Sequence, residues 1–291
     1  MQFKIQRIEL LNALNKVTRA VSSKSPLPVL TGIKFDISDS DLILTGSDSD
    51  ITIQTVIKEE NNILEIINPG SIVLSSKYIT EIIRKIDSEY VTFLTIEQSL
   101  TKITGDNSEF NLNGFNSIDY PQIDLSKSGE NFIINSIQLK NVIDQTIFAT
   151  SDRENRPTLT GLNLKSNSDC IECTATDSYR LAKKYISTEN NLEFNITIPK
   201  KSLSEISKII EKDEEINIYI NDRKILFVFD NVYIQTRLID GTFPDTSRLI
   251  PTSYDYILEA DSRELLSAID RASLFTTESA NIIKLSMSPT E

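Results

Sequence analysis

The sequence predicts an α+β fold made of repeated units, each with two helices packed on antiparallel sheet. Three observations support this prediction. Segments of the chain recur at a fixed spacing, each recurring unit contains two amphipathic helical patterns, and alternating apolar and polar runs fill the rest. The order helix, strands, helix, strands contains too few helices for alternating strand–helix–strand units, so it indicates helices on antiparallel sheet.

The first unit opens with an amphipathic helix and continues with strands. Leu10, Leu14, Val17 and Val21 follow the spacing of one buried helical stripe. Alternating runs at 33–37 and 51–56 then predict strands that bury one face.

A second helix of the unit begins after Ser75 and Ser76, residue types that favour a helix start. Its predicted apolar stripe is Ile79, Ile82, Ile83 and Ile86. Further strands are expected at 91–94 and 110–112, and segments rich in Pro, Ser and Asp at 121–130 and 244–252 are candidate linkers.

The repeats define the expected domains. The segment 30–33 recurs 129 residues later at 159–162, and Thr45, Asp48 and Ser49 recur at the same offset as Thr174, Asp177 and Ser178. Glu264–Ile269 repeats Glu9–Leu14 and starts a third unit, for which too few residues remain. We therefore expect domains at 1–124 and 125–250 and an incomplete third domain at 251–291.

The composition argues against several functional classes. The chain has no histidine, which removes the commonest general base, and its eight glycines form no phosphate-binding loop. Cys170 and Cys173 lack a second ligand pair for zinc, so we expect a structural role and no metal or cofactor. No secretory signal or membrane span is evident, which predicts a cytoplasmic protein.

Several motifs give the chain a family resemblance. The segment 26–32 (PLPVLTG), the segment 174–181 (TATDSYRL), the segment 240–245 (DGTFPD) with Arg248, and the segment 271–275 (RASLF) occur in order along the whole chain. They resemble the bacterial DNA sliding clamps, the beta subunits of DNA polymerase III.

The resemblance implies a fold and a function. Repeated DNA-clamp domains would form part of a ring, in which two chains join head to tail around duplex DNA. The clamp is a non-catalytic processivity factor that tethers the polymerase, and a separate clamp loader opens it. The implied partners are duplex DNA, the DNA polymerase III catalytic subunit, the loader and other proteins with clamp-binding motifs.

Sliding needs contacts that ignore sequence, which Lys and Arg aimed at phosphates provide. The net charge of −12 opposes DNA binding only as a sum, because basic residues recur at matched helix positions. By resemblance, the expected DNA-facing residues are Lys24, Lys77, Arg84, Arg153, Arg156, Lys200, Lys201, Lys208 and Arg271. Taken singly, each lysine would be read as a solvated surface residue.

The resemblance also implies a shallow apolar pocket between the second and third domains, which captures short peptides. The matching residues are Leu159, Thr176, Ser178, Tyr179, Arg180, Leu181, Pro244, Arg248 and Leu249. Without the resemblance, Leu159 and Leu181 would be read as core residues. Leu274 and Phe275 match positions of the dimer interface.

Two further hypotheses remain at this stage. The chain could be a truncated clamp that binds peptides or the loader but closes no ring. It could also be an enzyme that uses carboxylates, although no histidine, metal cluster or phosphate loop supports this.

Overall fold

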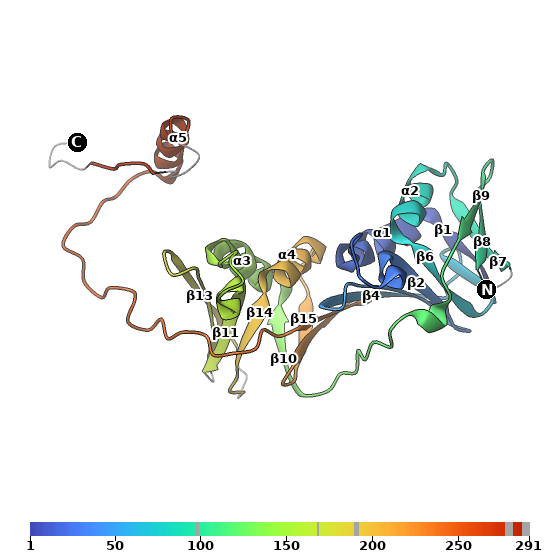
Figure 1. Cartoon of the computed structure of the whole chain (residues 1–291), viewed down its shortest axis with the longest axis horizontal. Coiled ribbons are helices and arrows are strands. Elements are labelled where there is room, and N and C mark those ends of the chain that lie inside the picture. Colours follow the sequence, from blue (N-terminus) through green and yellow to red (C-terminus); the bar gives the residue numbers. More distant parts are fainter. Residues whose placement is uncertain (97–98, 168, 189–191, 277–281, 287–291) are drawn as a thin grey trace. The chain divides into compact units, whose positions relative to one another are not determined.

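A computed structural model describes residues 1–96, 99–167, 169–188, 192–276 and 282–286. The chain divides into two compact units, Met1–Phe243 (unit 1) and Pro244–Glu291 (unit 2), coloured from blue to orange and from orange to red in Figure 1. Unit 1 contains both complete repeats, which we call the first repeat (1–124) and the second repeat (125–243). Strand pairing in unit 1 is antiparallel among the described residues, so the predicted α+β class is confirmed.

The first repeat contains two helices and nine strands among its described residues. The helices are α1 (Arg7–Val17) and α2 (Ser76–Lys85). The strands are β1 (Gln2–Gln6), β2 (Gly32–Ile37), β3 (Asp41–Ser47), β4 (Ile51–Lys58), β5 (Leu64–Asn68), β6 (Gly70–Ser75), β7 (Tyr90–Ile96), β8 (Leu100–Thr104) and β9 (Glu109–Asn113). The strands predicted at 33–37, 51–56, 91–94 and 110–112 lie in β2, β4, β7 and β9.

The second repeat follows the same order. Its helices are α3 (Ser136–Thr146) and α4 (Lys200–Ile209). Its strands are β10 (Glu130–Asn135), β11 (Gly161–Asn167), β12 (Cys170–Thr176), β13 (Leu181–Ser187), β14 (Asn195–Pro199), β15 (Glu215–Ile220), β16 (Lys224–Phe229) and β17 (Val232–Arg237). The candidate linker at 121–130 therefore ends where β10 begins.

One sheet joins the two repeats. Its eight strands run β10-β15-β16-β17-β4-β3-β2-β6, and the pairing of β17 with β4 aligns Ile234 with Ile53. The other sheets are β5-β1-β7-β8-β9 in the first repeat and β13-β12-β11-β14 in the second. By repeat equivalence β9 corresponds to β17 and β13 to β4, and both are edge strands among the described residues.

All four helices of unit 1 lie along the same face of the sheets (Figure 1). In α2 the predicted stripe is largely confirmed: Ile79 and Ile83 are fully buried, and Ile82 is half-buried. Apolar side chains of both repeats, from Phe3 to Ile234, form one continuous buried cluster. The stacked rings of Phe3 and Phe93, with centroids 4.6 Å apart, lie within it.

The first helix ends earlier than its apolar stripe predicted. α1 stops at Val17 and a 3₁₀ turn follows, after which Val21 is extended and half-buried. Gly46 of β3 explains the close packing there, because a Cβ at that position would collide with the carbonyl oxygen of Val17. The buried stripe is thus completed by a turn packed against the sheet.

Unit 2 contains one described helix, α5 (Ser262–Ser273). Asp261 caps its N-terminus, since its side chain accepts hydrogen bonds from the backbone N–H groups of Arg263 and Glu264. The described residues of unit 2 form no strand, and none of the residues of α5 is buried.

The two cysteines lie on opposite faces of β12, as the strand prediction required. Cys173 is buried, and this burial raises the pKa of its thiol to about 12. The thiol is therefore protonated at neutral pH, which supports the structural role expected from the sequence.

Candidate functional site

Basic residues occupy matched positions on the helix face of unit 1. Lys77 is the second residue of α2 and Lys201 the second of α4, and Arg84 and Lys208 stand near the end of the same two helices. All four side chains are exposed. The repeat seen in the sequence therefore places the same charges at the same two points of equivalent helices.

Each of these helices also carries the same internal ion pair. Arg84 pairs with Glu81 in α2, and Lys208 pairs with Glu205 at 2.7 Å in α4. Glu205 additionally pairs at 3.1 Å with Arg19, which follows α1 in the first repeat. Burial raises the pKa of Glu205, but hydrogen bonds from Lys208 and Arg19 outweigh it and leave this pKa lowered.

The start of α4 is tied to two loops. Lys200 pairs with Asp152 at 2.8 Å, and Lys201 pairs with Asp48 of the first repeat at 2.5 Å. By contrast, Lys24 and Lys77 form no ion pair with any described residue. The predicted DNA-facing set is therefore a mixture of paired and unpaired cations.

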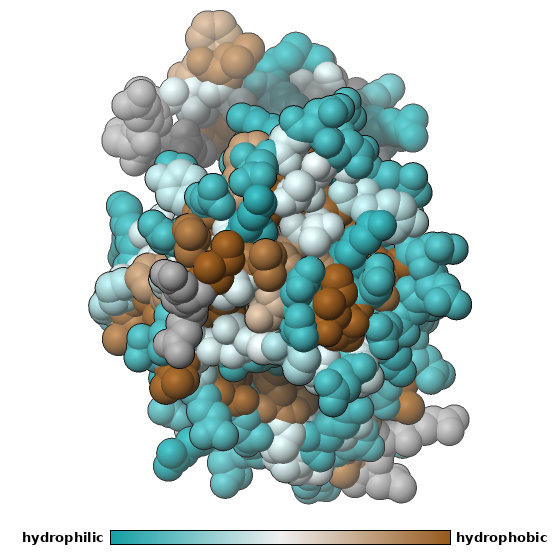
Figure 2. Space-filling view, turned by 90° about the vertical axis from the view of Figure 1, so that its right-hand side faces the viewer, coloured by the Kyte–Doolittle hydropathy of each residue, from teal (hydrophilic) through white to brown (hydrophobic). Residues whose placement is uncertain are grey.

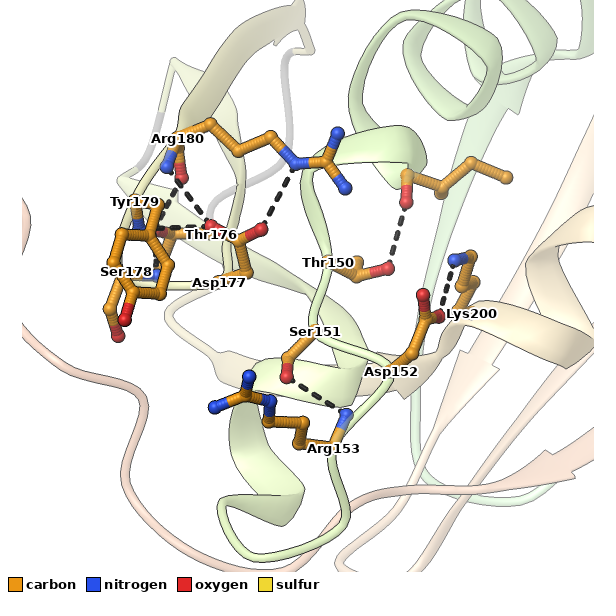
Figure 3. Close-up of polar contacts among 11 residues, drawn as sticks. Thr150, Ser151, Asp152, Arg153, Thr176, Asp177, Ser178, Tyr179, Arg180 and Lys200 are labelled. Atoms are coloured by element: carbon orange, nitrogen blue, oxygen red, sulfur yellow. Dashed lines mark hydrogen bonds and ion pairs between the residues drawn. The ribbon is translucent and has the colours of Figure 1, made fainter. Parts of the chain in front are cut away.

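The remaining predicted cations lie in different places. Arg153 and Arg156 belong to the exposed loop that follows α3, and Figure 3 shows Arg153 in this loop. Arg156 donates to the Ser178 hydroxyl at 3.2 Å, so it links this loop to the turn between β12 and β13. Arg271 lies in α5 of unit 2, where it donates to Ser267 at 2.7 Å.

The turn Thr176–Arg180, which carries residues of the predicted peptide pocket, is closed by its own hydrogen bonds (Figure 3). The Thr176 hydroxyl donates to the carbonyl of Arg180 at 2.7 Å and accepts from the N–H of Ser178. Asp177 accepts the N–H groups of Tyr179 and Arg180 and also pairs with the Arg180 side chain at 3.0 Å. The backbone N–H of Arg180, then that of Tyr179, lowers the pKa of Asp177.

The first repeat contains the same turn. Asp48 accepts the N–H groups of Asp50 and Ile51, and Ser47 takes the place of Thr176. Ser49 and Ser178 both adopt a left-handed backbone, with φ of 83° and 79°. The recurring Asp-Ser pair in the sequence is thus the signature of a turn that an aspartate holds closed.

The turn presents two exposed side chains beside a buried residue. Tyr179 is 91% exposed and Arg180 is also exposed, while Leu159 is buried and Leu181 half-buried. The guanidinium of Arg180 lies 5.9 Å from the centre of the exposed Phe148 ring. The other predicted pocket residues, Pro244, Arg248 and Leu249, belong to unit 2.

Two residues of this region were not among the predicted site residues. Asp177 holds the turn, and its recurrence at the repeat offset was the signal that could have identified it. Phe148 contacts Arg180 from the turn after α3, and no sequence pattern distinguished it from a core residue.

Leu274 and Phe275, the predicted interface residues, are 78% and 91% exposed at the end of α5. In unit 1, Figure 2 looks onto the end formed by β7, β8 and β9, where hydrophobic side chains interrupt a mainly polar surface. Exposed apolar residues of these strands include Leu94, Ile96 and Phe110.

Within the described ranges, no three His, Cys, Asp or Glu side chains are grouped so that they could hold a metal ion. None of the described helices has the length and hydropathy needed to cross a membrane.

Family models match most of the chain. Residues 1–124 match the N-terminal domain of the DNA polymerase III beta subunit, and residues 133–245 match its central domain.

Individual relatives agree with these matches. The beta sliding clamp of Bacillus subtilis is 41% identical over all of this chain and 79% of its own length. A crystal structure of the Bacillus subtilis clamp matches 96% of this chain and 75% of its own with a TM-score of 0.92. The beta chain of Streptococcus pneumoniae is 34% identical, covers 94% of this chain and 74% of its own, and has a TM-score of 0.90.

A Pseudomonas aeruginosa sliding clamp, solved with bound griselimycin, is 26% identical to this chain. It matches 97% of this chain and 76% of its own, with a TM-score of 0.89.

Proposed function

The chain belongs to the family of bacterial DNA polymerase III beta subunits, the beta sliding clamps, and from this premise we propose how its surfaces carry out the family's role. The protein is a processivity factor that tethers the replicative polymerase to its template. We assign its domains to residues 1–124, 125–250 and 251–291. We also propose that the protein acts in the cytoplasm and has no catalytic activity of its own.

The helix face of unit 1 is the proposed DNA-facing surface. The observation that carries this proposal is the identical placement of Lys77 and Lys201, and of Arg84 and Lys208, in two equivalent helices. Because phosphates recur at every base pair, cations repeated in this way suit a surface that contacts DNA without reading its sequence. The proposed set is Lys24, Lys77, Arg84, Arg153, Arg156, Lys200, Lys201, Lys208 and Arg271.

The ion pairs of this face suit sliding rather than tight binding. A phosphate that contacts Lys201 or Lys208 must compete with Asp48 or Glu205 for the same ammonium group. This competition weakens each contact and lets the contact exchange as the DNA moves. Retention on DNA would then come from the closed ring and not from affinity.

Salt dependence of binding tests the DNA-facing surface. We expect Lys77→Gln combined with Lys201→Gln to reduce the slope of log K against log salt concentration by roughly 1 to 2, measured by fluorescence anisotropy with a duplex oligonucleotide. Lys165→Gln is the matched control, because Lys165 is exposed on β11 and alternates with the buried Leu164. An equal slope for the double variant and the control would contradict the proposal.

The turn Thr176–Leu181 and Leu159 form the proposed peptide-binding surface of unit 1, and Pro244, Arg248 and Leu249 of unit 2 are further proposed peptide contacts. Its support is the contrast between a backbone held by Thr176 and Asp177 and the exposed side chains of Tyr179 and Arg180. Such a rigid turn can present polar anchors to an extended peptide without a large loss of entropy. The polymerase, the clamp loader and griselimycin are its proposed ligands.

We propose homodimerisation through the open edge of the first repeat. β9 is equivalent to β17, which pairs with β4 of the other repeat inside unit 1. The same type of pairing with a partner chain would cover Phe110, and Leu274 and Phe275 are the proposed apolar contacts from unit 2. The comparisons favour a processivity factor that tethers the polymerase over the alternative of a module that only binds peptides or the loader.

A further inference from the structure

A pocket lies within unit 1, at the junction of the two repeats. It has a volume of about 290 Å³ and is formed by the turn after β3, the linker that begins at Pro121, and strands β16 and β17. We call it the junction pocket. All of its walls belong to unit 1.

The junction pocket is built from the repeat equivalents of the proposed peptide pocket. Leu30, Ser47, Ser49 and Thr52 line it, and the residues 129 positions later are Leu159, Thr176, Ser178 and Leu181. Pro121 of the linker corresponds to Pro244, here at an offset of 123 because loop lengths differ between the repeats. Both turns have the same hydrogen bonds, so the equivalence extends from sequence to backbone.

One wall of the junction pocket is apolar. Leu30 is 1% exposed and belongs to a small buried cluster with Tyr120, against which Ile123 of the linker packs. Leu30, Pro121 and Ile123 all border the pocket. Because Leu30 is already buried, an aliphatic side chain placed here would exclude water from the exposed Pro121 and the half-buried Ile123.

Two further lining residues, Gln235 and Arg237, offer one acceptor and one donor. The Oε1 atom of Gln235 is buried and has no hydrogen-bond partner among the described residues. Among the described residues, the Arg237 side chain forms no hydrogen bond or ion pair, although its backbone N–H donates to the carbonyl oxygen of Asp50. A buried acceptor without a donor costs on the order of 1–3 kcal/mol, so a ligand or water that donates to Gln235 is favoured.

The charges argue against a phosphate ligand. Lys224 pairs with Asp124 at 2.9 Å and also donates to its carbonyl, so these two charges neutralise each other. The charges of Asp50 and Arg237, two exposed residues that also line the pocket, are likewise opposite in sign. A neutral ligand with both N–H and C=O groups fits this arrangement better than an anion does.

We propose that the junction pocket is a second site for a short extended peptide. An aliphatic side chain lies on Leu30 and Ile123, a backbone N–H donates to Gln235 Oε1, and a backbone carbonyl accepts from Arg237. The choice of a peptide rests on the proposed function of the equivalent turn at Thr176–Leu181.

The test uses the whole chain and acetyl-Gly-Leu-Gly-amide, followed by backbone amide NMR. We expect saturable shifts at Ser49, Asp50 and Gln235, with a Kd on the order of 1 mM. Two analogues of this peptide are N-methylated, one at Leu and the other at the following Gly. The analogue that loses the N–H donated to Gln235 should bind about tenfold more weakly than the parent peptide.

Two variants separate this site from the proposed peptide pocket. Gln235→Met keeps the length of the side chain and should abolish the shifts at Ser49, whereas Arg180→Gln should leave them unchanged. Shifts that persist in Gln235→Met, or no saturable shifts at Ser49 and Asp50, would overturn the inference. Shifts confined to Tyr179 and Arg180 would overturn it while leaving the proposed peptide pocket intact.

Discussion

At the scale of single residues, Asp48 and Asp177 close equivalent turns but differ in exposure and in their ion-pair partners. Asp48 and Asp177 each accept two backbone N–H groups and close equivalent turns. The Asp48 side chain is 7% exposed and pairs with Lys201 of the other repeat, whereas Asp177 is 21% exposed and pairs with Arg180 of its own turn. The first aspartate therefore links the repeats, and the second only shapes its turn.

We expect Asp48→Ala to lower the free energy of unfolding by about 2–3 kcal/mol, because it leaves two N–H groups and a lysine without their acceptor. Asp177→Ala, the matched substitution, should cause a smaller loss because solvent can replace the more exposed carboxylate. Urea denaturation of both variants at pH 7 measures the difference. Equal losses would show that the contact with Lys201 contributes nothing.

At the scale of elements, Glu205 connects α4 of the second repeat to the first repeat through an ion pair. It pairs with Lys208 in its own helix and with Arg19 beside α1, and its side chain is 18% exposed. Glu81 occupies the equivalent position in α2 but is 45% exposed, and its only ion pairs among the described residues are with Arg84 and Lys85 of its own helix. Equivalent residues thus give one internal helix contact and one contact that crosses the junction.

The pKa of Glu205 is lowered by folding, so its contribution to stability is present above its ordinary value of 4.5 and lost as the pH falls through the folded value. We expect Glu205→Gln to reduce stability at pH 7 by about 1–2 kcal/mol. The variant should also lose less stability than the parent chain between pH 4.5 and the acid unfolding region.

Glu81→Gln is the control, and its free energy of unfolding should differ from that of the parent by at most about 0.5 kcal/mol. Thermal unfolding over a pH series distinguishes the two.

At the scale of the whole molecule, one continuous sheet joins the two repeats. The pairing of β17 with β4 and the shared apolar cluster join residues of both repeats. Ile53 and Ile234 are fully buried partners at this seam. Cooperative unfolding is therefore expected to extend across the boundary between the first and second repeats.

We expect residues 1–243 to unfold in a single transition that near-ultraviolet and far-ultraviolet circular dichroism report together. Ile53→Asp places a carboxylate in the buried seam and should split this transition into two, since each repeat keeps its own helices and remaining strands. Leu94→Asp, on an exposed position of β7, is the control that should keep one transition. Two transitions in the parent chain would contradict a continuous unit.

Much of the fold could be predicted from the repeats and from periodicity. The offset of 129 residues identified equivalent turns, and the apolar stripe of α2 identified its buried face, because both depend on local backbone preferences. The stripe through Val21 misplaced the end of α1, because packing on Gly46 decides that end and local preference does not. For the site, the matched basic residues were visible in the sequence, but the ion pairs that join the two repeats were not.

By itself, the sequence determined which residues repeat, which face of each helix is basic and which family the motifs resemble, since these follow from residue type and spacing alone. Only the tertiary structure decided that β17 pairs with β4, that Lys201 meets Asp48 and that Glu205 meets Arg19. It also brought Leu30 and the Gln235 acceptor to the lining of one pocket, the junction pocket. Such contacts join residues more than a hundred positions apart, and they form only when the two repeats share one sheet.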